Sequence, residues 1–342
     1  MPSPAASRIT AVRPLWAVEG GRVNILGERF SVDPVPSEVT IGGTPSRLVF
    51  ASSRALTAIV PSGLDGGQTP VRVDSAAGET AFVDVGVPLA TGLHQVDNPA
   101  FDSAGNLYVT FSGSRGQQPP VSVFKVGADG ARVPFVSDLS NATSMAFDRE
   151  GRLHVSSRFD GSVHQVDARG RSKVVATDLG IACGIAFGPN GDLFVGDRSG
   201  SILRVAGERA EIIATLPGSV AAFHLAFGPE GYLYVAAPTV SSSDGLYRIS
   251  PDGRTEQFGT RFGRPQGIAF DAAGRLYVVD SLAGSSGLYR VDISRPTEVE
   301  QLLAGGPLIG LAFAPAGGLV VASTDTVFRF DVPLGGWLFA QG

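Results

Sequence analysis

Cysteine is nearly absent from this chain of 342 residues, which has a single thiol, Cys183. One cysteine forms no intrachain disulfide and excludes a zinc site built from several thiolates. The sequence also lacks a long unbroken apolar run, so it predicts no transmembrane helix and no membrane insertion. Its first residues lack the apolar core of a signal peptide. As written, we expect a soluble cytoplasmic protein, or an exported one if a leader has been removed.

Surplus charge of either sign is scarce as well. With Lys+Arg 27 and Asp+Glu 32 the formal net charge is −5, and charged residues make up only 17% of the chain. This balance provides neither the basic footprint of a nucleic-acid-binding protein nor a polybasic membrane patch. Hydrophobic residues reach 43%, with Gly 45 and Pro 23, a mixture typical of many short strands joined by tight turns. The composition therefore favours an all-β fold.

A repeated phrase organises the sequence from about residue 87 onward. It reads Gly-Ile-Ala-Phe or a close variant, then a short turn, then Leu-Tyr-Val or a close variant. Successive anchor phenylalanines are 46, 40, 40, 43 and 43 residues apart, and the six anchors are Phe101, Phe147, Phe187, Phe227, Phe270 and Phe313. A period in this range with β character is typical of a β-propeller or a solenoid. Each repeat fits four strands, so we predict a six-bladed propeller over residues 87–342.

The sequence leaves open which segment closes the ring. Residues 87–93 read as an outer strand ahead of the first repeat, and residues 336–340 offer a second candidate. A closed ring needs no partner to cover its strand edges, which favours a monomer. Arginines also recur on the third strand of several repeats, and we expect their stems to lie along a neighbouring blade.

The segment before the propeller has a different pattern. Residues 1–6 read as a loose tail, and residues 7–86 hold short alternating β segments bounded by Gly, Pro, Ser or Asp. Ile9-Thr-Ala-Val-Arg-Pro, Glu19-Gly-Gly-Arg-Val-Asn-Ile-Leu-Gly and Val39-Thr-Ile-Gly-Gly-Thr-Pro resemble an IPT/TIG domain. The resemblance implies an immunoglobulin-like sandwich that serves as a spacer or interaction surface and carries no catalysis.

The repeats themselves resemble the propellers of the NHL-repeat and senescence-marker/gluconolactonase superfamily. In the gluconolactonase-like enzymes a carboxylate of the first blade, with an Asn and an Asp of later blades, holds a hard divalent cation at the channel. The residues four places before each anchor should lie near the channel mouth, and they are Asp97, Thr143, Cys183, Phe223, Gln266 and Ile309.

This ring departs from the family pattern. Asp97-Asn98-Pro aligns with the family's Glu-Gly-Pro opening, whereas Phe and Ile cannot ligate and Cys is too soft for Ca²⁺. We therefore expect no cofactor, with a divalent cation such as Ca²⁺ at Asp97 as the alternative. Asp97 is equally suited to cap a turn, and Cys183 to a buried structural role.

Other candidate residues surround the same channel mouth. His224 lies three places before its anchor, where three repeats have glycine, so it should approach the channel. The loops that open on this face add charged side chains that suit a small polar ligand or a peptide. With the ring, the candidate binding residues are Asp97, Asn98, Thr143, Cys183, His224, Gln266, Arg158, Asp197, Arg198, Arg264 and Asp280.

Three functions fit these residues. The first is a non-enzymatic binding or scaffold protein, in which the channel mouth and rim recognise a small polar ligand or a protein partner. The second is a gluconolactonase-like hydrolase with an atypical metal site around Asp97, Asn98, Thr143 and Gln266. The third is a metal-independent lyase with His224 as general base, which requires a carboxylate or amide to orient the imidazole. The depleted ring favours the first, so we do not expect an enzyme.

Overall fold

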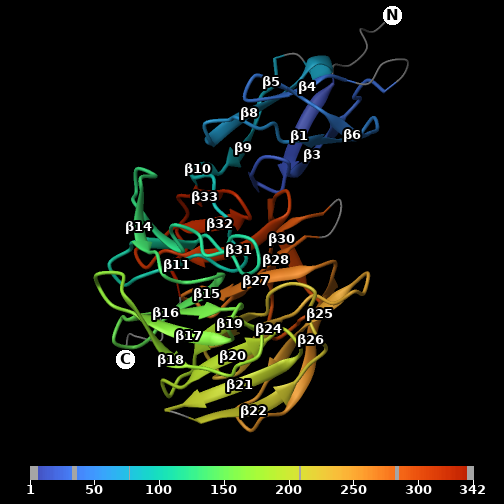
Figure 1. Cartoon of the computed structure of the whole chain (residues 1–342). Coiled ribbons are helices and arrows are strands. Elements are labelled where there is room, and N and C mark those ends of the chain that lie inside the picture. The colour runs from blue at the N-terminus through green and yellow to red at the C-terminus, as the bar shows by residue number, and fades with distance from the viewer. Residues whose placement is uncertain (1–6, 33–36, 77, 208, 282–284, 337–342) are drawn as a thin grey trace, which may run out of the picture.

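The computed structural model describes residues 7–32, 37–76, 78–207, 209–281 and 285–336. They form an N-terminal β-sandwich and a six-bladed β-propeller (Figure 1), so the predicted all-β fold is confirmed. The predicted tail at 1–6 lies outside the described residues, as do 337–340 of the second candidate for ring closure. Within the described part of the chain, no helix has the length and apolar character that crossing a bilayer requires.

Two sheets make up the sandwich. Side chains alternate along its strands, and the buried ones, such as Ile25, Ile41, Leu56 and Val71, form one core between the sheets. One sheet has the order β1 (Arg8–Arg13), β3 (Arg22–Glu28), β7 (Ala55–Ile59), β6 (Leu48–Ala51). The other contains β2 (Trp16–Ala17), β9 (Ala81–Val85), β8 (Gly67–Val73), β4 (Val39–Ile41) and β5 (Thr44–Ser46), with a 3₁₀ turn at Asp74–Ala76.

A two-residue strand fastens the sandwich to the propeller. Trp16 and Ala17 of β2 pair in parallel with β9 on one side and with β30 (Val299–Ala304) of the propeller on the other. The backbone N–H of Val18 also donates to Ala304 O at 2.9 Å. The second sandwich sheet therefore continues into a propeller blade as one nine-stranded sheet, and backbone hydrogen bonds hold the two domains together.

Each blade is a four-stranded antiparallel sheet whose first strand lies innermost. The first three blades are β11 (Ala100–Phe101), β12 (Leu107–Thr110), β13 (Val123–Val126), β14 (Arg132–Val136); β15 (Ala142–Phe147), β16 (Leu153–Ser157), β17 (Ser162–Val166), β18 (Ser172–Ala176); and β19 (Ala182–Phe187), β20 (Leu193–Asp197), β21 (Ser201–Ala206), β22 (Arg209–Thr215). Blades four and five are β23 (His224–Phe227), β24 (Leu233–Ala236), β25 (Asp244–Ile249), β26 (Thr255–Phe262); and β27 (Pro265–Phe270), β28 (Leu276–Asp280), β29 (Gly287–Val291), β30.

Blade six closes the ring with a strand that precedes blade one in the sequence. Its order is β31 (Leu308–Phe313), β32 (Leu319–Ser323), β33 (Val327–Phe330) and then β10 (Val87–Ala90). Inner strands contact each other around the whole circle, including β11 against β31. The sequence left two candidate segments for ring closure. The one that precedes the first repeat supplies the outer strand of the last blade.

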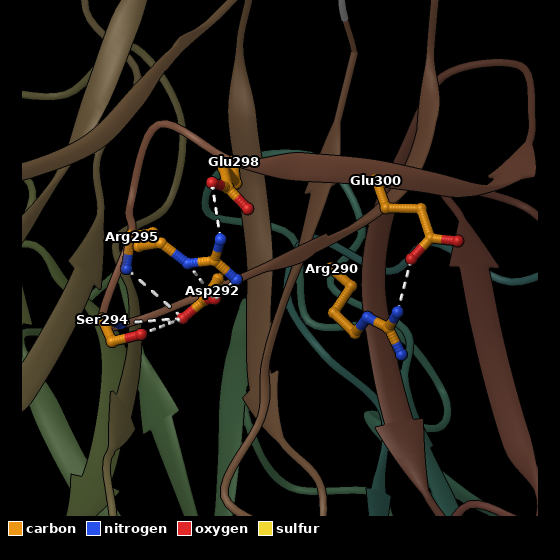
Figure 2. A network of polar contacts seen from close by, with 6 residues as sticks. All are labelled: Arg290, Asp292, Ser294, Arg295, Glu298 and Glu300. Atoms are coloured by element: carbon orange, nitrogen blue, oxygen red, sulfur yellow. Dashed lines mark hydrogen bonds and ion pairs between the residues drawn. The ribbon is translucent and has the colours of Figure 1, made fainter.

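The arginines on the third strands divide between a neighbouring blade and their own. Arg329 of blade six donates to Ala128 O of blade one at 3.0 Å, as we had expected. Arg248 pairs with Glu256 and Arg290 with Glu300, each across to the fourth strand of its own blade. Figure 2 shows the Arg290 pair in blade five beside a second cluster around Arg295. For Arg248 and Arg290 the expectation was wrong, because a glutamate stands directly opposite each of them in the antiparallel register.

Ring closure by β10 predicts a position-specific loss of stability. Ala90 is 5% exposed and packs in the core between blades six and one, whereas Pro88 on the same strand is exposed. Ala90→Asp buries an unpaired carboxylate and should lower the unfolding free energy by about 3 kcal/mol or more. Pro88→Asp should change it by less than about 0.5 kcal/mol. Urea unfolding measures both, and equal losses would contradict closure by this strand.

A buried histidine predicts how the fold responds to acid. Burial lowers the pKa of His154 although Asp148 opposes the shift. A histidine whose pKa is lowered in the folded protein leaves the unfolding free energy unchanged above its ordinary pKa near 6.5. As the pH falls below that ordinary pKa, the unfolding free energy decreases progressively. Three other blades carry a Tyr at this position, and Tyr277 Oη donates to Asp271 there at 2.9 Å. His154→Tyr should therefore flatten the loss of melting temperature between about pH 6.5 and 5, and parallel wild-type and variant curves would refute this.

Candidate functional site

The candidate site lies where the inner strands of the blades begin. Asp97, Thr143, Cys183, Phe223 and Gln266 are all buried there, with between 0% and 7% of their surface exposed. Asp97 precedes β11 of blade one, and His224 begins β23 of blade four. In a ring of six, blades one and four stand opposite each other, so a contact between these residues crosses the channel.

That contact exists. His224 Nδ1 lies 2.5 Å from Asp97 Oδ1, and the two side chains are 0% and 3% exposed. The approach is within ion-pair distance but is not aligned as a hydrogen bond. On its other side, His224 Nε2 lies 3.2 Å from Gln266 Oε1 of blade five. Both imidazole nitrogens therefore face protein oxygens, and side chains of three blades meet across the channel.

Asn98 ties the same region together from blade one. Its Nδ2 donates to the carbonyl of Ile268 in blade five, and its Oδ1 accepts from the N–H of Leu311 in blade six, both at 3.0 Å. A Cβ placed on Gly267 would lie 2.2 Å from Asn98 Oδ1. The glycine of the repeated phrase in blade five thus makes room for this side chain, which links three inner strands.

The remaining ring positions serve packing. Thr143 Oγ1 donates to Asn141 O at 2.8 Å, and Phe223 lies in the core between blades three and four. Ile309 is partly buried against the core of blade six. Burial raises the pKa of the Cys183 thiol to about 12, so the thiolate form is scarce at neutral pH.

These residues do not fit the oxygen shell of a hard divalent cation. Asp97 Oδ1 already accepts from the N–H of Asn98 at 2.6 Å and lies against His224. Phe223 and Ile309 supply no ligand atoms, while Ca²⁺ requires about six to eight oxygens. No group of three or more His, Cys, Asp or Glu side chains suited to a metal occurs in the described residues.

The acidic residues of the surrounding loops are occupied by the loops themselves. Asp197 Oδ1 accepts from the N–H of Ile181 at 2.8 Å. Asp280 accepts from the N–H groups of Gly263 and Arg264 at 3.0 and 2.7 Å. Burial raises the pKa of Asp280, although these amides oppose the shift. Both carboxylates therefore hold loop backbones in place.

The arginines of this face that make hydrogen bonds contact backbone carbonyls. Arg198 donates to the carbonyls of Ser219 and Val220, and Arg158 approaches Gly113 O at 3.5 Å. Among the described residues, no carboxylate lies within ion-pair distance of Arg158, Arg198 or Arg264. Arg264 lines an open hollow of about 480 Å³ together with Val220, Thr239 and Ser281.

The structure thus divides the predicted site residues into two groups. Asp97, Asn98, His224 and Gln266 meet inside the channel. The others lie at the ends of strands or in the loops beside them, and they are Arg158, Asp197, Arg198, Arg264 and Asp280. Sequence reasoning missed the direct partnership of Asp97 with His224, which stand 127 residues apart in the chain. The number of repeats could have indicated this contact, because in a ring of six blades the fourth faces the first.

Comparisons with known proteins agree with this architecture. Residues 7–82 match the family model of the IPT/TIG domain. No curated protein matches the sequence at a significant level.

Several solved structures are similar across the fold. An auxiliary nutrient binding protein from Bacteroides ovatus is 15% identical, covers 95% of this chain and 98% of its own, and has a TM-score of 0.53. A protein of unknown function from Bacteroides thetaiotaomicron is 14% identical, covers 96% of this chain and 99% of its own, and has a TM-score of 0.56. A gluconolactonase from Xanthomonas campestris is 17% identical, covers 72% of this chain and 89% of its own, and has a TM-score of 0.59. At these identities the likeness concerns the fold alone. The chain contains an IPT/TIG domain at residues 7–82, joined to a six-bladed propeller whose fold is similar to that of the Xanthomonas campestris gluconolactonase.

Proposed function

We propose that this protein is a non-enzymatic binding protein that recognises a small polar ligand on the face of the propeller where the channel opens. One observation carries the proposal, namely the contact of His224 with Asp97 across the channel, supported by Gln266. This contact uses the two most reactive candidate side chains to hold opposite blades together. Their chemistry then serves the scaffold, and recognition falls to the loops around it.

A catalytic role demands access that these groups lack. A general base must come within about 2.6–3.2 Å of the proton that it removes, directly or through one water. His224 is 0% exposed, and each of its ring nitrogens already faces a protein oxygen. The same contact occupies the carboxylate around which the gluconolactonase-like metal site would be built.

The loops are better placed for binding. They rise from a closed ring of sheets, and rigid scaffolds commonly carry their recognition residues on such loops. The similar protein from Bacteroides ovatus is described as nutrient binding and spans the same two domains, which supports a ligand-binding role here. We propose a monomer in which the IPT/TIG domain holds the propeller in a defined orientation.

The lyase remains the competing hypothesis because Asp97 does meet the requirement for a group that orients His224. It would require the channel to open and expose Nε2, which faces Gln266. Any turnover that depended on His224 would favour it over a binding role.

Activity and ligand screens on the full chain test the proposal. We expect no hydrolysis or elimination above the uncatalysed rate with lactones or cyclic esters, with or without Ca²⁺, Mg²⁺, Mn²⁺ or Zn²⁺. A small polar ligand should instead raise the melting temperature, by an amount equivalent to about 2.7 kcal/mol at a hundred times Kd. Turnover that disappears in Asp97→Asn or His224→Gln would overturn the binding proposal.

A double-mutant cycle tests the cross-channel contact itself. Removing one partner of a buried pair leaves the other unpaired and typically costs about 3–5 kcal/mol. Asp97→Ala and His224→Ala should each lower the unfolding free energy by about this amount, and the double variant should lose clearly less than their sum. Strict additivity in urea unfolding would mean that the two side chains do not interact.

A further inference from the structure

We propose that the ligand of this face is an anion carrying a carboxylate or phosphoryl group, and that Arg158, flanked by Arg115 and Arg198, receives it. This inference rests on the proposed binding function and adds the chemical class of the ligand. The composition alone does not predict an anion site, because the chain as a whole is acidic, with a net charge of −5.

The three arginines stand on consecutive blades of one face. Each lies in the loop between the second and third strands of its blade, Arg115 in blade one, Arg158 in blade two and Arg198 in blade three. The first loop is held against blade two by Asn141, whose Nδ2 donates to Ser112 O at 2.6 Å and whose Oδ1 accepts from the N–H of Gly116 at 2.7 Å. The loops of blades one and two therefore form a continuous wall.

Arg158 is the centre of this group, and none of the carboxylates that the structure describes is its counter-ion. Its Nε is buried without a hydrogen-bond partner, and its nearest polar contact is the carbonyl of Gly113 at 3.5 Å. Burial lowers the pKa of the guanidinium, and the charges of Arg198 and Arg115 lower it further. A partly buried charge of this kind gains most from an anionic partner with hydrogen-bond geometry.

Neutral groups without partners lie in the same region. Ser112 Oγ and His94 Nδ1 are both buried with no hydrogen-bond partner. His94 is close enough to Arg158 for the arginine to add to the lowering of its pKa, which burial causes first. An oxyanion at Arg158 would bring acceptor oxygens to a region where donors are left over.

The nearby carboxylates do not neutralise this charge. Asp97 contacts His224 and accepts a hydrogen bond from the N–H of Asn98, and Asp197 accepts hydrogen bonds from loop amides. Asp160 accepts a hydrogen bond from Ser162 Oγ at 2.7 Å within its own loop. Guanidinium groups match carboxylate and phosphate oxygens in paired geometry, which is why the free charge here selects an oxyanion and not a simple halide.

Titration calorimetry on the full chain at low ionic strength tests the inference with three probes: inorganic phosphate, malonate and neutral myo-inositol. We expect phosphate or malonate to bind and inositol not to bind. Arg158→Gln should weaken anion binding about tenfold or more, since a charge-assisted hydrogen bond is lost. Arg209→Gln removes the same charge from an exposed position on β22 and should leave binding unchanged. The stronger of the two anions identifies whether the ligand carries a phosphoryl group or a carboxylate.

Further variants and outcomes keep the test decisive. If Arg158→Gln fails to fold, Arg198→Gln at an exposed site and Arg158→Lys, which keeps the charge but loses the paired geometry, should still weaken binding. Equal anion affinity in Arg158→Gln and Arg209→Gln would overturn the inference. Binding of inositol alone, unchanged in Arg158→Gln, would overturn the anion and leave the binding function intact. Turnover dependent on His224 would instead overturn the proposed function.

Discussion

The ring depends on an edge-to-face contact between aromatic rings of successive blades. The aromatic residue on the second strand of one blade meets the anchor phenylalanine of the next, as Tyr277 meets Phe313 with ring centroids 4.9 Å apart. The same arrangement joins the other four consecutive pairs, Tyr108–Phe147, His154–Phe187, Phe194–Phe227 and Tyr234–Phe270. At the closing junction, Val320 and Phe101 pack in one core. Each aromatic pair contributes about 0.5–1.5 kcal/mol beyond burial.

A ring held in this way determines which side chains meet in its centre. Six blades place the first opposite the fourth, and Asp97 and His224 thereby come within 2.5 Å of each other. Asn98 adds bonds from blade one to blades five and six, which brace the junction that β10 closes from outside. Asp97, His224 and Gln266 are thus joined to one another inside the channel, and for this reason the proposed binding function is assigned to the loops.

The acidic and the basic side chains around the channel have different hydrogen-bond partners. Carboxylates such as Asp197 and Asp280 accept hydrogen bonds from backbone amides and order the turns, so these oxygens are directed at the loop backbone. Within the described part of the chain, the guanidinium groups of Arg158 and Arg198 donate to backbone carbonyls and to no carboxylate, so their positive charge remains available. A protein with an acidic composition can therefore present a cationic face, because net charge counts residues whereas a binding surface depends on which charges are already paired.

The sequence by itself determined the all-β class and the number of blades, because the anchor phenylalanines recur wherever a blade must pack on its neighbour. It also identified the IPT/TIG domain and the residues nearest the channel. Only the tertiary structure decided that β10 closes the ring, that Trp16 joins the two domains into one sheet, and that Asp97 pairs with His224. These contacts join segments between 127 and 287 residues apart, and nothing in a local pattern encodes which distant partner a strand edge or a buried carboxylate will meet.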